Sequence, residues 1–259
     1  MKLQILPARQ GAQWVKQGIQ TFFRQPLALS GLFFLFMAVM SVLNIVPVLG
    51  SALALTLLPS ATLGLMAATK EVGNGKFPMP SILASAFRAG RQQMRAMLVL
   101  GALYAAGFLL VLGLSALIDG GKFAKLYLIG GVMTPELLQE GDFQLAMLVA
   151  MALYLPLSLL FWHAPALVHW HGISPVKSLF FSLVACLRNF WAFTVYGLVW
   201  MAAFLFMGMV VASVTALLGS AELVAATLFP AAMLMAAMFF TSIYFTFRDS
   251  FEAPSGENP

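Results

Sequence analysis

Six long apolar runs alternate with short polar stretches along this chain. A helix needs about 20 apolar residues to cross roughly 30 Å of hydrocarbon, and these runs have about that length. The pattern therefore predicts an all-α, polytopic membrane protein with six transmembrane helices. The expected spans cover about residues 26–46, 52–69, 97–118, 143–162, 190–218 and 223–247.

An amphipathic segment precedes the first pair of spans. In residues 8–24, a helical wheel places Trp14 and Phe22 on one half and Lys16 and Arg24 on the other. A helix divided in this way is typical of the plane of the membrane interface. The alternative is a soluble amphipathic helix that packs on a globular core.

A second amphipathic helix is expected after Pro80. Ile82, Leu83, Ala86, Phe87 and Met94 would share its apolar face. Arg88, Arg91 and Arg95 lie on the opposite face, where they would attract anionic lipid at about 1 kcal/mol each. Simple retention of this loop in the cytoplasm explains the three arginines as well, and it is the preferred interpretation.

The third helix of this kind begins at Pro175. Ser178 and Ser182 form one polar strip, and Lys177 and Arg188 form another. The rest of the wheel is apolar, so this helix is expected to lie deeper, with protein on more than one side.

The pattern thus repeats three times within one integral membrane domain, 1–259. Each module combines an interfacial amphipathic helix with a hairpin of two spans, and the modules cover about 7–69, 80–167 and 175–249. The second arm of each hairpin contains a proline. These prolines are Pro59, Pro156 and Pro230. Internal repeats occur in transport folds and also in folds without a transport role.

Charge orients the spans. With six spans, twelve of the fourteen Lys and Arg residues fall on one side of the membrane, and only Lys122 and Lys125 fall on the other. The positive-inside rule then places both termini in the cytoplasm. It makes residues 119–142 a periplasmic loop and 250–259 a cytoplasmic tail, which is expected to be disordered. The net charge of +5 is explained by this orientation, so no nucleic-acid partner is expected.

The chain offers little chemistry. Every Asp, Glu, Lys and Arg lies at an end of a span or in a loop, which disfavours an ion-coupled pump. No serine-hydrolase elbow, Walker loop, HExxH or CxxC motif is present. The single cysteine, Cys186, excludes a disulfide framework. Cys186 could be a lipidation site, but its interpretation as a buried small residue is preferred. No catalytic residue, cofactor or metal is therefore expected.

Three histidines cluster beside two tryptophans. His163, His169 and His171 could suggest a metal site, but their spacing does not place them on one helical face. An interfacial belt with Trp162 and Trp170 is the preferred interpretation.

Other polar residues have a structural and a functional interpretation. Packing or capping is preferred for four residues that could instead line a pathway: Asn44, Thr56, Ser60 and Ser158. Arg248 and Asp249 are expected to form a boundary ion pair or to stop the last span. The alanine pairs Ala102/Ala106 and Ala232/Ala236 would let helices approach closely. The candidates for the lipid interface are Trp14, Lys16, Arg24, Arg88, Arg91, Arg95, Trp162, Trp170, Lys177 and Arg188.

Three stretches carry a resemblance to a known family. They are ARQGAQWVKQGIQTFFRQP near the start, WHAPALVHWHGISPVKSLFFSLVACLRN in the centre and YFTFRDSF at the close. Together they resemble an uncharacterised family of six-helix inner-membrane proteins from Gram-negative proteobacteria. The Tyr-x-x-x-Arg-Asp pattern is more distantly similar to other proteobacterial membrane domains, including the membrane part attached to some glycerophosphodiester phosphodiesterases. The resemblance implies an inner-membrane helical bundle and carries no activity.

Three functions agree with this pattern. The first is a non-enzymatic inner-membrane protein that acts in the envelope through contacts with membrane lipids, including anionic ones, or with a membrane-protein partner. The second is a small permease or channel for a neutral or amphiphilic solute. A membrane enzyme that acts on lipid ranks last, because no acid, base and nucleophile converge.

Overall fold

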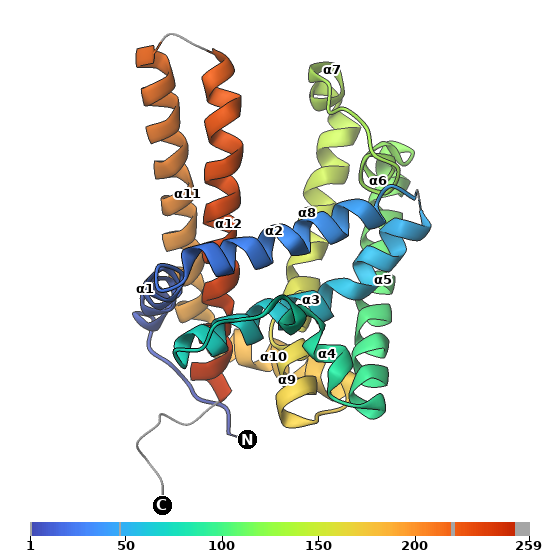
Figure 1. Cartoon of the computed structure of the whole chain (residues 1–259). Helices are drawn as coiled ribbons and strands as arrows, with labels where there is room; N and C mark the ends of the chain where they lie inside the picture. The colour runs from blue at the N-terminus through green and yellow to red at the C-terminus, as the bar shows by residue number, and fades with distance from the viewer. Residues whose placement is uncertain (1, 47, 219–220, 252–259) are drawn as a thin grey trace, which may run out of the picture. The chain divides into compact units, whose positions relative to one another are not determined.

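The computed structural model describes residues 2–46, 48–218 and 221–251, and within these ranges it contains helices and no strand (Figure 1). The helices are α1 (Gln10–Phe22), α2 (Pro26–Leu43), α3 (Leu49–Gly73), the 3-10 helix η1 (Pro80–Ala84), α4 (Ser85–Arg88), α5 (Arg91–Asp119), α6 (Lys122–Leu128), α7 (Pro135–Gln139), α8 (Gly141–Phe161), α9 (Ala164–His171), α10 (Pro175–Arg188), α11 (Phe190–Leu218) and α12 (Ala221–Phe251).

Six stretches of helix are long and apolar enough to cross a membrane, as the sequence pattern predicts. They are Pro26–Leu43, Leu49–Gly73, Arg91–Asp119, Gly141–His171, Phe190–Val214 and Ala226–Phe251. The expected all-α fold with six spans is confirmed. Most of the tail that is expected to be disordered, residues 252–259, lies outside the described residues.

The chain divides into two compact units. Unit 1 comprises Met1–Phe34, Gly64–Leu83 and Ala185–Pro259, and unit 2 comprises Leu35–Leu63 and Ala84–Val184. The boundaries fall within α2, α3, η1 and α10. This division follows packing, whereas the three predicted modules follow a sequence pattern, and the modules stay a prediction.

In unit 1, α1 packs on the antiparallel helices α11 and α12 (Figure 1). Its buried face includes Trp14, Val15 and Phe22 together with Gly11 and Gly18. A Cβ atom on Gly11 would overlap the carbonyl oxygen of Ala192, and one on Gly18 would overlap Ser242. The helices therefore touch backbone to backbone, and the apolar face of α1 is covered by protein.

In unit 2, α5 packs along α8, and the short helix α6 folds back against both of them. Gly101 of α5 lies against the carbonyl oxygen of Thr56 on α3, where no side chain would fit. By contrast, Ala102 and Ala106 are exposed. Close approach in this unit therefore uses a glycine and not the alanine pair expected from the sequence.

The second amphipathic helix differs from the prediction. The segment after Pro80 forms η1 and α4, and the chain then breaks at Gly90, whose φ of 103° is a conformation that residues with a Cβ rarely adopt. The next helix, α5, begins at Arg91. Arg91 and Arg95 therefore lie on the first turns of a span, and the expectation of one continuous amphipathic helix here is wrong.

The third helix, α10, agrees with the prediction on one face only. Ser178 and Ser182 are fully buried. Val176 and Phe180 on the same helix are exposed. The serine strip thus faces protein. The expectation that protein covers this helix on more than one side is wrong at Val176 and Phe180.

Candidate functional site

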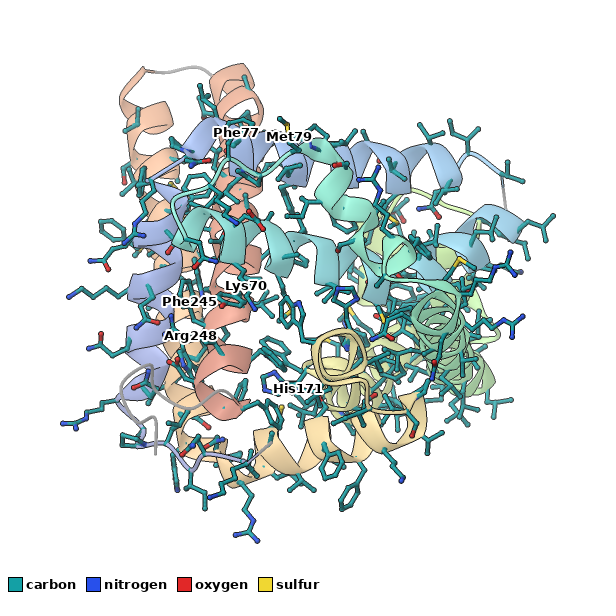
Figure 2. The ribbon with its side chains drawn as sticks, turned by 60° about the horizontal axis from the view of Figure 1, so that its bottom comes forward. Lys70, Phe77, Met79, His171, Phe245 and Arg248 are labelled. Carbon is teal, nitrogen blue, oxygen red and sulfur yellow. The ribbon has the colours of Figure 1, made fainter. Side chains whose placement is uncertain are left out.

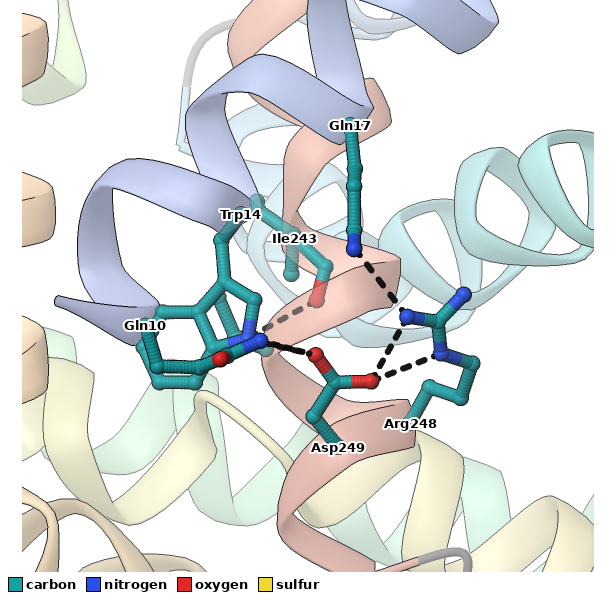
Figure 3. A network of polar contacts seen from close by, with 7 residues as sticks. Gln10, Trp14, Gln17, Ile243, Arg248 and Asp249 are labelled. Carbon is teal, nitrogen blue, oxygen red and sulfur yellow. Dashed lines mark hydrogen bonds and ion pairs between the residues drawn. The ribbon is translucent and has the colours of Figure 1, made fainter. Parts of the chain in front are cut away.

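A polar network joins α1 to the last turn of α12 in unit 1 (Figure 3). Asp249 Oδ2 accepts hydrogen bonds from Gln10 Nε2 at 2.7 Å and from Trp14 Nε1 at 3.0 Å. Asp249 Oδ1 accepts from Arg248 Nε at 2.7 Å. Arg248 Nη2 in turn donates to Gln17 Oε1 at 3.0 Å. Both carboxylate oxygens and the guanidinium are thus engaged by the protein itself.

Aromatic rings surround this network. Trp14 is fully buried, and its ring centroid lies 5.2 Å from that of Phe193 and 6.0 Å from that of Tyr196. The Arg248 guanidinium lies 4.8 Å from the centroid of Phe245, a cation–π contact on one face of α12 (Figure 2). The three donors Gln10, Trp14 and Arg248 therefore take the place of hydrogen bonds to water at the carboxylate of Asp249.

Asn189 holds the segment that precedes α1. This residue connects α10 to α11 and is 1% exposed. Its Oδ1 accepts from the backbone N–H of Leu6 at 2.8 Å, and its Nδ2 donates to the carbonyl of Gln4 at 3.0 Å. The N–H of Gln4 donates to the carbonyl of Ser250 at 2.9 Å. Residues from the start, centre and close of the chain therefore meet in unit 1.

Sequence reasoning identified only one contact of this site, the Arg248–Asp249 ion pair, which the structure contains. The roles of Gln10, Gln17 and Asn189 were missed. A signal for the glutamines was present, because Gln10 and Gln17 are seven residues apart and therefore lie two turns apart on one helical face. Nothing in the local sequence around Asn189 indicates its partners, which are more than 180 residues away.

The three histidines have three environments. His163 is fully buried, His169 is half-buried and His171 is exposed. The interpretation of His163 as an interfacial residue is therefore wrong. Its backbone N–H donates to Ser182 Oγ at 2.9 Å, and Ser182 Oγ donates to the carbonyl of Leu159 at 2.8 Å. Ser182 thereby satisfies the backbone where α8 ends and α9 begins.

In the described part of the chain, no group of three or more His, Cys, Asp and Glu side chains is placed to hold a metal ion.

Most candidates for the lipid interface are accessible. Trp162 and Trp170 are half-buried. Trp14 is the exception and a correction, because its ring is enclosed by protein and its N–H is bonded to Asp249. The exposed candidates are Lys16, Arg24, Arg88, Arg91, Arg95, Lys177 and Arg188.

The four candidates for a pathway make local contacts. Asn44 Nδ2 donates to the carbonyl of Met40 at 2.9 Å, and Thr56 Oγ1 donates to the carbonyl of Ala52 at 2.8 Å. Ser158 Oγ donates to Leu155 at 2.7 Å, and Ser60 is buried. Thr56 and Ser158 thus bond to the backbone of their own helices, and Asn44 bonds to the backbone of the helix that precedes it. Their role as pathway residues stays a prediction.

Comparison with known proteins places the chain in a family. No protein-family model matches it, and no solved structure matches it. A curated protein of Burkholderia thailandensis, named a probable inner membrane protein, is 40% identical to it over 254 residues, which cover 97% of this chain and 94% of that protein. Identity at this level over nearly both full lengths shows common descent. The chain therefore belongs to the uncharacterised family of six-helix inner-membrane proteins that includes this Burkholderia protein.

Proposed function

We propose that this protein is a non-enzymatic, multi-pass protein of the inner membrane, with both termini in the cytoplasm. It acts in the envelope through contacts with membrane lipid, anionic lipid included, or with a membrane-protein partner. The proposal is carried by exposed basic side chains at the ends of several spans. In the proposed six-span topology, these ends lie on the cytoplasmic side of the membrane. Arg24 precedes α2, Arg91 begins α5, and Lys177 and Arg188 lie between α9 and α11.

The arginines around the start of α5 are the best placed for lipid. Arg91 and Arg95 are four residues apart, so they project from one side of the first two turns. Within the described residues, Arg88, Arg91 and Arg95 form no ion pair with a carboxylate. Three basic side chains next to the headgroup region would attract anionic lipid at about 1 kcal/mol each.

The state of Asp249 supports a non-enzymatic role. A general acid or base needs a carboxyl group that can reach a substrate. Asp249 instead accepts hydrogen bonds from Gln10, Trp14 and Arg248, and it holds helices together. The alternative function, a permease for a neutral or amphiphilic solute, draws no support from Asn44, Thr56 or Ser158, whose polar groups bond to nearby backbone.

Lipid contact is tested with two charge-matched double variants, Arg91→Gln/Arg95→Gln and Lys122→Gln/Lys125→Gln. Each protein is extracted from membranes with its surrounding lipid in a polymer, and the ratio of anionic to zwitterionic phospholipid is measured. We expect enrichment of anionic lipid around the native protein, and a clear loss of this enrichment in the arginine variant only. Equal ratios in all three samples would refute the lipid part of the proposal.

The orientation is tested by labelling single cysteines from either side of the membrane. Cys186→Ala removes the native thiol, and Lys76→Cys and Val132→Cys add exposed ones. We expect a membrane-impermeant maleimide to label Val132→Cys from the periplasm and Lys76→Cys only after the membrane is opened. Labelling of both positions from the same side would refute the orientation.

The partner is tested by crosslinking in native membranes followed by affinity capture. Recovery of one membrane protein in a constant ratio to this chain is the expected result. Absence of any such protein would remove the partner from the proposal and leave the lipid contacts.

A further inference from the structure

Unit 2 contains an apolar cavity of about 80 Å³ between α5, α6 and α8. Its walls consist of hydrocarbon side chains and aromatic rings. The lining residues are Phe108, Val111, Leu112, Phe123, Tyr127, Ala150, Met151 and Tyr154. None of the residues predicted to line a pathway is among them.

The cavity lies along one half of two spans. Phe108 to Leu112 fall in the second half of the span Arg91–Asp119, and Ala150 to Tyr154 fall in the first half of the span Gly141–His171. The cavity is open at its side, because Tyr127, Met151 and Tyr154 are 59%, 62% and 41% exposed. In the six-span topology, α6 belongs to the expected periplasmic segment but folds back along α5 and α8, so this opening is expected to face the outer half of the hydrocarbon.

Polar contacts hold α6 in place as one wall of the cavity. Asp119 accepts hydrogen bonds from the N–H groups of Gly121 and Phe123, at 2.8 and 2.7 Å. At the other end of α6, Ser51 Oγ donates to the carbonyl of Leu128 at 3.1 Å. Because both ends are fixed, α6 cannot simply collapse into the space between α5 and α8.

The ion pair between Lys122 and Glu140 adds a third connection, from the first residue of α6 to the residue before α8. Phe123 and Tyr127 project from α6 toward the cavity, and the ring centroids of Phe108 and Tyr127 are 5.8 Å apart. The ring of Tyr154 meets that of Phe108 edge-on at 6.0 Å. Four aromatic rings, those of Phe108, Phe123, Tyr127 and Tyr154, thus form a large part of the walls.

We propose that this cavity binds the terminal segment of an acyl chain of a membrane lipid. Engineered apolar cavities of about 150 Å³ stay dry and bind benzene, so a space of about 80 Å³ suits a few methylene groups. An empty space would deprive the surrounding rings of dispersion contacts, which a chain from the adjacent lipid restores. This inference rests on the proposed role in lipid contact and adds a specific site to it.

The test uses the full chain in lipid nanodiscs with a phospholipid that carries a diazirine at the end of one acyl chain. After illumination, labelled residues are mapped by mass spectrometry. We expect labelling of Tyr127 on α6 and of Met151 on α8 to exceed labelling of Leu148 on α8 at least threefold, although Leu148 is 60% exposed. We also expect labelling of Tyr127 to saturate as the fraction of probe rises.

Two variants of α8 provide a matched pair. Ala150→Phe places a ring in the cavity and should reduce labelling of Tyr127 at least threefold, whereas Ala152→Phe adds the same ring on the exposed side and should leave it unchanged. Saturable labelling in the native chain remains decisive if Ala150→Phe does not fold. Labelling of Tyr127 that equals that of Leu148 and rises linearly with probe would overturn the inference.

The test of the acyl-chain site can fail independently of the test of the proposed function. The enrichment of anionic lipid depends on Arg91 and Arg95, which do not line the cavity. Loss of specific labelling with unchanged enrichment would overturn the acyl-chain site alone. Loss of enrichment with saturable labelling of Tyr127 would instead overturn the role of the arginines.

Discussion

Asp249 should contribute more to stability than any exposed carboxylate of this chain, and Asp249→Ala tests this. The substitution removes the acceptor of three donors at once: Gln10 Nε2, Trp14 Nε1 and Arg248 Nε. It also releases α1 from the last turn of α12, since two of these donors belong to α1. We therefore expect destabilisation of unit 1, and in particular of the docking of α1.

The magnitude follows from the burial of each donor. Trp14 is 0% exposed, so its N–H would be left without an acceptor, and this costs about 1–3 kcal/mol. Gln10 and Arg248 are half-buried and can turn toward water, so each should cost only about 0.5–1 kcal/mol. The expected loss is about 2–5 kcal/mol. Glu140→Gln is the control, because its ion pair with Lys122 is about half-exposed and should contribute under about 1 kcal/mol.

A double-mutant cycle with Trp14→Phe makes the test specific. Alone, Trp14→Phe keeps a ring in place and removes one donor, which should cost about 1 kcal/mol. Combined with Asp249→Ala it should cost nothing or stabilise, because the donor that it removes no longer has an acceptor. Thermal melting of the purified chain in detergent gives the free energy of unfolding for the native chain, the two single variants and the double variant. Effects that add to within about 0.5 kcal/mol would refute the network, because residues in contact should couple more strongly.

Three further predictions test other contacts of unit 1. Gly18→Ala should destabilise the protein by about 1–3 kcal/mol in the same melting assay, since a methyl group would overlap Ser242, whereas Gly31→Ala, with open space around it, should be neutral or slightly stabilising; equal effects would contradict the close packing. Asn189→Ala should raise hydrogen exchange at the Leu6 amide roughly tenfold, and unchanged exchange would show that Asn189 does not hold the N-terminal segment. Burial raises the pKa of the Cys186 thiol to about 12, so a maleimide at pH 7.5 should label it slowly in the folded protein and rapidly after unfolding; fast labelling of the folded chain would refute its burial.

The spans were predictable because their signal is local. Each apolar run decides by its own length and composition that it enters lipid, whatever it packs against. Amphipathicity was local as well, and the wheel correctly placed Trp14 and Phe22 apart from Lys16. It could not say what the apolar face contacts. Lipid and the surface of α11 and α12 are both apolar, so a wheel cannot distinguish them.

The buried roles of Trp14 and His163 could not be derived from patterns. Trp and His at the end of a span are typical of the membrane interface, and only the fold shows that Asp249 approaches Trp14 and that Ser182 approaches His163. Helix breaks are another example. Gly90 interrupts a pattern whose arginines alone suggest continuity, because the break depends on backbone conformation and the wheel records only side-chain polarity.

The contacts of unit 1 indicate that α1 stabilises the packing of the last hairpin, α11 and α12. Only 6% of the residues in the apolar window of α11 are buried, against 39% in that of α12, so α11 in particular gains little from packing on other helices. In lipid, the hydrophobic effect does not drive helices together, and close approach and polar bonds must do so. Gly11 and Gly18 provide the close approach, and Asp249 and Asn189 provide the polar bonds. It follows that α1 and the segment before it fasten one end of the last hairpin, so their loss should impair the docking of that hairpin and leave its insertion into the membrane unaffected.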